Sequence, residues 1–258
     1  MTGYLIARNT TGPTNHPRKE NRFHALNLNV LSRYYEHAHG GNDYISRYMV
    51  ARDATGSTDH LLKQNRFYTL YQVVLNVLRR RLVGAVAECG CWLGHSTHLM
   101  AGLLADRAWS GRLWVFDSFE GLSEATEKDR TQRGDTEVAT SVRKELKHSS
   151  NLRSVQRALA RFPFVSLHKG WIPEVFGTAL IPREQKFALV HIDVDLYQPT
   201  IDSLRFFYPR MADGGVIVVD DYGSTTFPGA KAAVDEFMEE VEVAWFLESH
   251  LQGAVLVV

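Results

Sequence analysis

Residues 84–97 read GAVAECGCWLGHST, and this stretch indicates the fold more clearly than any other part of the chain. Its apolar beginning, Gly84–Cys91, predicts a buried strand, and the segment Gly94–Asp106 that follows predicts a helix. Gly90 and Gly94 allow the backbone to turn tightly between the two elements and to approach a ligand closely. The helix would direct its free N–H groups toward the same ligand. A strand, a glycine turn and a helix in this order predict the first unit of a ligand-binding α/β fold.

The turn differs from the GxGxxG fingerprint of dinucleotide-binding proteins, because only two glycines are present and Trp92 stands between them. A site that clamps a pyrophosphate is therefore not expected. Two interpretations stay open at this point. The turn either receives a cofactor with a carboxylate or amino-acid group, or it is purely structural.

From Leu82 onward, short apolar runs rich in β-branched residues alternate with helix-sized segments. This alternation is typical of βαβ units, which build a mostly parallel sheet with helices on both faces. The predicted fold is α/β and Rossmann-like, with seven strands of which the last two form a hairpin at the sheet edge. The predicted strands are Gly84–Cys91, Leu113–Phe116, Phe164–His168, Phe187–Ile192, Gly215–Asp220, Ala244–Leu247 and Gly253–Val258, and the predicted helices are Gly94–Asp106, Asn151–Phe162, Pro199–Met211 and Gly229–Val241.

An internal repeat precedes the predicted sheet. Residues 4–26 and 48–70 align at an offset of 44, with twelve identities in twenty-three positions. Each copy predicts a short extended piece, a glycine turn and the start of a helix. We therefore expect an N-terminal helical and extended extension, residues 1–81, before a main domain of residues 82–258. The extension is either a lid or an arm that joins a homo-oligomer of two or more chains, or a local duplication that only adds surface.

The composition narrows the classes of function. Lys+Arg and Asp+Glu both number 29, so the formal net charge is zero, which argues against binding nucleic acid by neutralising phosphates. Hydrophobic residues make up 45% of the 258 residues, enough for a sizeable core. The N-terminus does not resemble a secretory signal, and no apolar run approaches the roughly 20 residues that cross a bilayer. Because Cys89 and Cys91 form neither a disulfide framework nor a good zinc motif, we expect a cytoplasmic protein.

Residues 123–150 carry many charged side chains of both signs, Asp129 among them. A segment of this kind is typical of a solvated face rather than of a core element. We therefore interpret it as an exposed insertion between two parts of the predicted sheet.

An acidic residue follows the second predicted strand. In open parallel sheets, ligands bind beyond the carboxyl ends of the strands, and an acid at the second exit can accept hydrogen bonds from a ribose diol. Asp117 stands at this position, about 25 residues after the glycine turn. A helix N-cap is the alternative role for Asp117. Together, the two strand exits predict a site for an adenosine-bearing ligand without a demanding phosphate group.

Two pairs of aspartates end the fourth and fifth predicted strands, namely Asp193 with Asp195 and Asp220 with Asp221. Because neighbouring strand ends meet at one edge of a sheet, three or four carboxylates should lie in one small region. Like charges at such range are costly unless a cation or a proton intervenes. A cluster with only oxygen ligands selects a hard ion, above all Mg²⁺. The alternative is a set of helix caps and solvated turn residues.

Five motifs of the chain, taken together, resemble the macrocin O-methyltransferase (TylF/MycF-like) family, whose members belong to the class I S-adenosylmethionine (SAM) methyltransferases. The likeness runs in order from about Leu62 to Glu240. The resemblance implies a SAM-dependent enzyme that methylates a hydroxyl of a small molecule, often a sugar or other natural-product intermediate, with the help of Mg²⁺. The motifs are ECGCWLGHST (88–97), VFDSFEGL (115–122), HKGWIPEVF (168–176), HIDVDLYQPT (191–200) and VIVVDDYGSTTFPGAKAAVDEF (216–237).

The resemblance also implies roles for single residues. Asp193 would be both a metal ligand and the general base, with Asp220 and Asp221 as further metal ligands, whereas Asp195 fits less well as a ligand. Arg66, in the helix before the sheet, matches a position close to the cofactor. The other implied cofactor contacts are Glu88, Gly90, Trp92 and Ser96 for the methionine half, Asp117 and Ser118 for the ribose, and Gly170 and Trp171 for the adenine.

Three other functions stay open for a chain with this pattern. A nicotinamide-dependent oxidoreductase would use the same type of sheet, although the GxGxxG spacing is missing. A cofactor-binding but non-catalytic partner or scaffold would use the repeat as its interaction module. A metal-dependent hydrolase would not need the acceptor at Asp117. The fold class alone does not distinguish among these functions.

Overall fold

The computed structural model describes residues 43–58, 61–130, 151–249 and 252–258, and of residues 61 and 62 only the backbone. The chain divides into two units, Met1–Ile45 and Ser46–Val258, and the second unit contains the sheet. The first copy of the repeat, residues 4–26, lies outside the described residues. A lid or a dimer arm built from it therefore stays a prediction.

The second unit contains one seven-stranded sheet in the order β3-β2-β1-β4-β5-β7-β6. The first five strands run parallel, and β7 pairs antiparallel with both β5 and β6. This arrangement confirms the predicted mostly parallel sheet with a C-terminal hairpin. The strands are β1 (Ala85–Cys89), β2 (Leu113–Asp117), β3 (Val165–Lys169), β4 (Phe187–Ile192), β5 (Met211–Val219), β6 (Trp245–Glu248) and β7 (Ala254–Val257).

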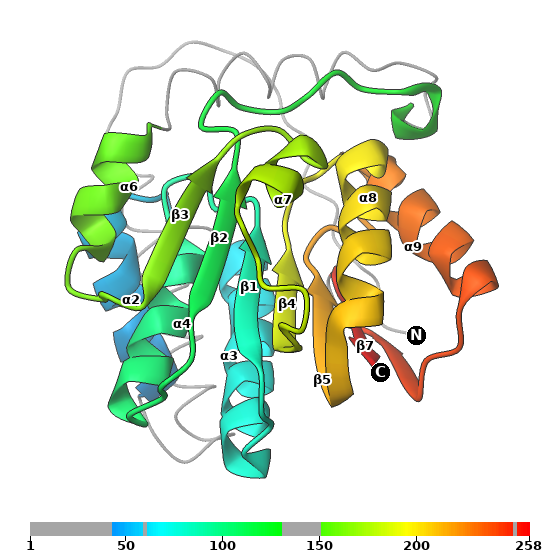
Figure 1. Cartoon of the computed structure of the whole chain (residues 1–258). Helices are drawn as coiled ribbons and strands as arrows, with labels where there is room; N and C mark the ends of the chain where they lie inside the picture. The colour runs from blue at the N-terminus through cyan, green and yellow to red at the C-terminus, as the bar shows by residue number, and fades with distance from the viewer. Residues whose placement is uncertain (1–42, 59–60, 131–150, 250–251) are drawn as a thin grey trace, which may run out of the picture. The chain divides into compact units, whose positions relative to one another are not determined.

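Helices lie on both faces of this sheet. Figure 1 shows α3 and α4 behind the sheet and α7 and α8 in front of it. No helix in the described part of the chain combines the length and the apolar character needed to cross a bilayer. The helices are α2 (Asp43–Thr55), α3 (Leu61–Arg80), α4 (His95–Asp106), α6 (Leu152–Leu159), α7 (Glu174–Thr178), α8 (Tyr197–Phe207) and α9 (Pro228–Glu240), with short 3₁₀ turns η1 (Glu127–Asp129) and η2 (Tyr208–Arg210).

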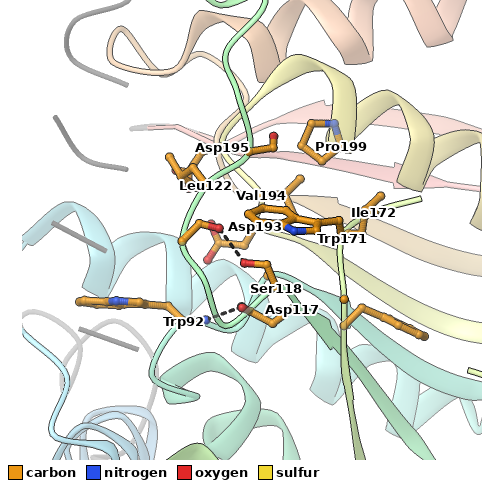
Figure 2. A pocket seen from close by; sticks show the side chains of 15 residues that line it. Trp92, Asp117, Ser118, Leu122, Trp171, Ile172, Asp193, Val194, Asp195 and Pro199 are labelled. Atoms are coloured by element: carbon orange, nitrogen blue, oxygen red, sulfur yellow. Dashed lines mark hydrogen bonds between the residues drawn. The ribbon is translucent and has the colours of Figure 1, made fainter. Parts of the chain in front are cut away.

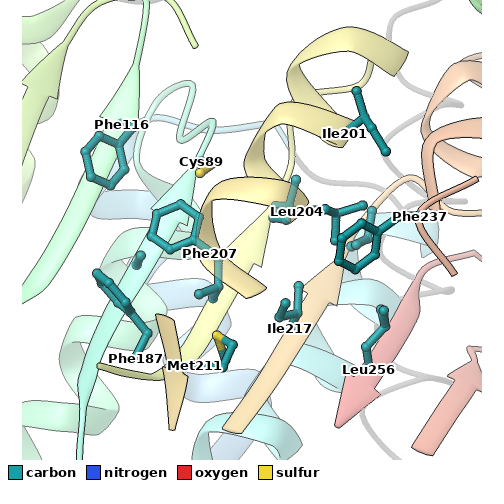
Figure 3. Close-up of a cluster of buried hydrophobic side chains, with 14 of the residues drawn as sticks. Cys89, Phe116, Phe187, Ile201, Leu204, Phe207, Met211, Ile217, Phe237 and Leu256 are labelled. Carbon is teal, nitrogen blue, oxygen red and sulfur yellow. The ribbon is translucent and has the colours of Figure 1, made fainter. Parts of the chain in front are cut away.

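The main apolar core fills the face of the sheet that α7, α8 and α9 cover (Figure 3). Successive strand residues point to opposite faces, so Ala87 and Cys89 of β1 enter this core while Glu88 points to the opposite side. Phe207 of α8 makes an edge-on contact with the Phe187 ring, at a centroid distance of 5.0 Å. This packing anchors α8 to the sheet, and with it the strand exit that leads into α8.

The structure corrects the predicted elements at two places. The second repeat copy begins inside helix α2 rather than in an extended piece, because Tyr48 and Ala51 are spaced for one helical face and are fully buried. Met211, the predicted last residue of a helix, is instead the first residue of β5. Pro209 lies in η2, where the helix has already ended, and it cannot supply a backbone N–H to continue it.

Candidate active site

The glycine turn after β1 brings three strand exits together. The N–H of Gly90 donates to the carbonyl of Phe116 in β2 at 2.8 Å, and the N–H of Asp193 donates to the carbonyl of Cys89 at 2.8 Å. Gly90 has a φ of +80°, and a Cβ at this position would lie 1.8 Å from the carbonyl oxygen of Asp193. Only glycine therefore allows the exits of β1 and β4 to approach so closely.

Asp117 holds this turn in place. Its Oδ2 accepts hydrogen bonds from the N–H groups of Cys91 at 2.7 Å and Trp92 at 3.0 Å, and its Oδ1 accepts from Phe119 at 2.6 Å. Burial raises the pKa of Asp117, although these hydrogen bonds oppose the shift. Asp117 thus holds a turn and does not cap a helix, since α4 begins after Gly94 without a side-chain cap, and it also lines the pocket described next.

A pocket opens at the carboxyl edge of the sheet (Figure 2). It lies between the exits of β1, β2, β3 and β4, where a ligand of an open parallel sheet is expected. The Trp92 ring points away from Trp171 and from the middle of the pocket in this view. Seven residues predicted for the site line the pocket: Gly90, Trp92, Asp117, Ser118, Gly170, Trp171 and Asp193.

Three residues predicted to lie at the cofactor, Glu88, Ser96 and Arg66, do not line this pocket. Glu88 is fully buried and accepts hydrogen bonds from the hydroxyl of Thr97 and from Nδ1 of His191, the latter at 3.0 Å. The side chain therefore lies on the α4 face of the sheet. The sequence-based assignment of Glu88 to the methionine half differs from this placement, because strand alternation turns the side chain away from the pocket.

His191 connects Glu88 to the aspartates at the end of β5. Its Nε2 lies 3.8 Å from Oδ1 of Asp220, which is longer than a hydrogen bond. Burial opposes protonation of His191, but the carboxylates of Asp220 and Glu88 outweigh it and raise the pKa of His191 to about 10. A protonated imidazolium between two buried carboxylates neutralises part of their charge.

Three of the four aspartates at the ends of β4 and β5 form one cluster. Asp193, Asp195 and Asp221 each offer a carboxylate oxygen, and these oxygens lie within 4.8 Å of one another. The resemblance implied Asp220 as a metal ligand and favoured Asp195 less, whereas the three oxygens that lie this close together include that of Asp195 and not that of Asp220. Asp195 enters the cluster because its backbone adopts the left-handed region, with a φ of +61°.

Arg66 lies against the aspartates rather than among the residues that line the pocket. Its Nε is 3.0 Å from Oδ2 of Asp220 and its Nη1 is 3.2 Å from Oδ1 of Asp221. Although burial opposes the shift, Arg66 and His191 lower the pKa of Asp220. Asp220 thus has two cationic neighbours, of which Arg66 also contacts Asp221.

The remaining three carboxylates fit a divalent cation. Burial and the neighbouring carboxylates raise the pKa of Asp193 and of Asp195 well above the ordinary value. Oδ2 of Asp221 is buried and has no hydrogen-bond partner in the described part of the protein. A crowded set of carboxylate oxygens, half-buried at Asp193 and Asp195 and buried at Asp221, is the kind of donor set that a hard ion such as Mg²⁺ prefers.

One neighbour of this cluster was not predicted from the sequence. Gln252, in the turn between β6 and β7, donates from Nε2 to Oδ1 of Asp221 at 2.8 Å. Because β7 runs antiparallel to β5, the turn before β7 lies at the carboxyl end of β5. The predicted hairpin could therefore have pointed to this turn, although not to the particular side chain.

Comparison with known proteins identifies the family. The profile of the family described as Macrocin-O-methyltransferase (TylF) matches residues 9–250. Demethyldecarbamoylnovobiocin O-methyltransferase of Streptomyces niveus is 32% identical over 67% of this chain and 65% of its own length. Mycinamicin III 3''-O-methyltransferase of Micromonospora griseorubida is 29% identical over 66% of each chain. The matched region thus spans just under two thirds of each relative.

Solved structures agree with this result. The structure of the O-methyltransferase NovP is 27% identical to the chain, with a TM-score of 0.62, and the match covers 75% of this chain and 79% of NovP. The strand order and the antiparallel β7 are those of a class I methyltransferase fold, which confirms the predicted fold class. Since the family profile spans nearly the whole sequence, the chain belongs to the macrocin O-methyltransferase (TylF) family of SAM-dependent enzymes.

Proposed function

We propose that this protein transfers the methyl group of SAM to a hydroxyl of a small natural-product intermediate, with a sugar hydroxyl as the preferred acceptor. The observation that carries the proposal is the pocket itself, which is lined both by the glycine turn with Asp117 and by Asp193 and Asp195 of the acidic cluster. A cofactor site and a group able to take a proton are thereby adjacent. Methyl transfer from SAM to a hydroxyl needs this combination.

SAM would occupy the pocket with its ribose beside Asp117 and Ser118 and its adenine beside Gly170 and Trp171. This orientation is supported by the position of Asp117. Its carboxylate holds the turn through hydrogen bonds, but the residue is only partly buried and lines the pocket. The methionine end would then approach Gly90 and the start of α4, whose N–H groups favour a carboxylate. A sulfonium is a good leaving group, so alignment of the two reactants is the main task of the protein.

Asp193 is the proposed general base. It lies at the exit of β4 and lines the pocket, where a carboxylate can accept the proton of a bound hydroxyl. Asp193, Asp195 and Asp221 would hold Mg²⁺. When bound, the ion would lower the pKa of the acceptor hydroxyl and help to orient it.

The choice of acceptor is supported by the names of the relatives, which act on a novobiocin precursor and on mycinamicin III. Both names specify O-methylation. A hydroxylated small molecule is therefore the proposed partner, rather than a protein or a nucleic acid.

Calorimetric titration of S-adenosylhomocysteine (SAH) into the full-length protein tests the cofactor, first with Mg²⁺ and then with a chelator. Micromolar binding is expected in both buffers, with added heat or tighter binding in Mg²⁺. No binding in either buffer would refute the methyltransferase proposal and favour the hydrolase. Binding of NAD instead of SAH would favour the oxidoreductase.

Turnover of SAM tests the base, with mycinamicin III and demethyldecarbamoylnovobiocin among the acceptors. Asp193→Asn should bind SAH as the wild type does and lose nearly all turnover, because the amide cannot accept the proton. If this variant retains most of its activity, Asp193 is excluded as the base. SAH binding without turnover on any hydroxylated acceptor would favour a non-catalytic scaffold.

Two further parts of the proposal concern the protein as a whole. A cytoplasmic location is supported by Cys89 and Cys91, which are both free thiols, as expected in a reducing compartment. A homo-oligomer of two or more chains is supported only by the repeat in the sequence. Light scattering of the full chain and of a truncation that starts at Tyr48 would test it. If both proteins contain the same number of chains per particle, the first copy has no role in assembly.

A further inference from the structure

One carboxylate in the segment after β2 is buried, although the sequence predicted this segment to be solvated. Asp129, the last residue of η1, is only 1% exposed. Its Oδ2 accepts hydrogen bonds from the backbone N–H of Thr126 at 2.7 Å and from the Thr126 hydroxyl at 2.9 Å. Its Oδ1 accepts from the backbone N–H of Tyr197 at 2.7 Å. Three donors from two separate parts of the chain thus share this side chain.

The bond to Tyr197 serves as a helix cap. Tyr197 is the first residue of α8, and the N–H groups of a first turn have no partner within the helix. The residue before it, Leu196, has no side chain able to cap the helix. Asp129 therefore supplies the cap from 68 positions earlier in the chain, and its negative charge is favourable at a helix N-terminus.

A glycine of α9 leaves the room for this contact. A Cβ on Gly229 would lie 1.8 Å from Oδ1 of Asp129 and 2.8 Å from the backbone nitrogen of Tyr197. A side chain at this position would therefore displace the carboxylate. The junction of η1, α8 and α9 is thus closely fitted around one buried acid.

Both segments that Asp129 joins form walls of the pocket. Leu122 and Ser123 line it from the segment that leads to η1, and Asp195 and Pro199 line it from the start of α8. Figure 2 shows the labelled members Leu122, Asp195 and Pro199 on the same side of the pocket. The spacing between these two walls depends on what connects them.

We propose that Asp129 is a positioning residue that holds the two walls of the cofactor pocket together and so retains bound SAM. This inference rests on the proposed function for the identity of the ligand. Lys128 also connects these elements at the surface, where its ammonium group pairs with Glu236 of α9 at 3.1 Å and lies 5.1 Å from the centre of the Tyr197 ring. Because Lys128 is 55% exposed, this pair contributes little, and the buried carboxylate carries the restraint.

The test is the variant Asp129→Asn in the full-length protein, with SAH as the probe. The amide has the shape of the carboxylate, but its NH₂ group cannot accept a hydrogen bond, so one wall is released. SAH affinity should fall about ten-fold, the effect of one buried hydrogen bond, mainly through faster dissociation. Hydrogen exchange at the amide of Tyr197 or of Thr126 should become faster in the same variant.

Three further variants separate positioning from general stability. Gly229→Ala keeps the carboxylate but forces it aside, and it should weaken SAH binding as Asp129→Asn does, so it serves if the first variant does not fold. Asn151→Ala removes the cap that Asn151 gives to the N–H of Ser154 in α6, away from the pocket, and should lower the melting temperature without changing SAH binding. Lys128→Ala should leave SAH affinity and dissociation unchanged.

The outcomes separate the two proposals. If the wild type binds SAH and Asp129→Asn binds it equally well, the role of Asp129 is excluded and the proposed function stands. The same holds if Asn151→Ala weakens SAH binding as much as Asp129→Asn, since the loss then follows stability alone. If the wild type does not bind SAH, the proposed function itself is refuted.

Discussion

The carboxyl edge of the sheet has two halves that are held together by different forces. In the cofactor half, formed by the exits of β1, β2 and β3, backbone N–H groups converge on the single carboxylate of Asp117. In the acid half, formed by the exits of β4 and β5, four aspartates lie near one another. Their charge is partly balanced by Arg66 and His191.

The difference shows in which half the polar groups are satisfied by contacts within the protein. The hydrogen bonds of Asp117 are formed within the protein, so the turn at which we propose that the cofactor binds is held in shape by the protein alone. In the acid half, burial and the neighbouring carboxylates raise the pKa of Asp193 and of Asp195, and Oδ2 of Asp221 has no hydrogen-bond partner among the residues that the structure describes. We infer that this half reaches its best arrangement only when a cation or a proton is added.

The largest effect is expected where the two halves meet, at Glu88. The variant Glu88→Ala removes the acceptor of both Thr97 and His191 and leaves a buried, charged imidazole partly uncompensated. The free energy of unfolding should fall by about 3–5 kcal/mol, as for other broken buried ion pairs. Urea unfolding at constant pH measures this, and Glu88→Gln, which keeps one acceptor, should lose less. Equal stability of Glu88→Ala and the wild type would show that this pair does not join the halves.

A somewhat smaller effect is expected for Gly90→Ala. The new Cβ would meet the backbone carbonyl of Asp193, and the residue would have to keep a φ of +80°. The exits of β1 and β4 must then separate, at a cost of about 3 kcal/mol in the free energy of unfolding. The matched control is Gly102→Ala in α4, where nothing lies within 4 Å of the new atom, and which should raise stability slightly. A Gly90→Ala protein as stable as this control would contradict the close approach.

Within the cofactor half, Asp117→Ala should weaken SAH binding about thirty-fold, or about 2 kcal/mol, because three backbone N–H groups lose a charged acceptor and the turn loosens. Calorimetry measures the affinity. Glu120→Ala, which removes an exposed acid three residues later, is the control and should not change it. Unchanged binding by Asp117→Ala would mean that the turn keeps its shape by other contacts.

The smallest expected effect is the stabilisation of the acid half by Mg²⁺. At ten times its dissociation constant, Mg²⁺ should stabilise the wild type by about 1.4 kcal/mol in thermal unfolding. Asp195→Asn should abolish this gain, because Asp195 belongs to the cluster, whereas Asp220→Asn should retain it, because Asp220 faces Arg66 and His191. The reverse result would restore the assignment made from the sequence. No stabilisation of the wild type by Mg²⁺ would exclude the metal site.

Much of the fold could be predicted from local patterns. Strand-length apolar runs and helix-length segments alternate along the chain, and six of the seven predicted strands match observed strands to within two residues at each end. The exception, β5, begins four residues early at Met211, because the turn around Gly214 and Gly215 interrupts but does not end its pairing with β4. The extended piece predicted for the start of the second repeat copy was wrong, since similarity between two copies says nothing about whether either is helical.

The candidate site divides in the same way. The position of each functional residue at a strand exit followed from the sequence, because parallel strands place their carboxyl ends at one edge. The residues at the strand exits therefore predicted a cofactor site beside Asp117 and a group of acidic side chains around Asp193. Side-chain direction beyond the end of a strand did not follow, since no period of two or 3.6 residues applies there.

The sequence by itself determined the class of fold, the sheet edge at which the candidate site lies and the residue types that gather there, because each depends on patterns over short stretches of chain. Only the tertiary structure decided that Glu88 faces His191, that Asp195 rather than Asp220 joins the acidic cluster, and that Asp129 caps a distant helix. Each of these is a contact between segments far apart in the chain. Its energy depends on burial and on charges that meet only after folding.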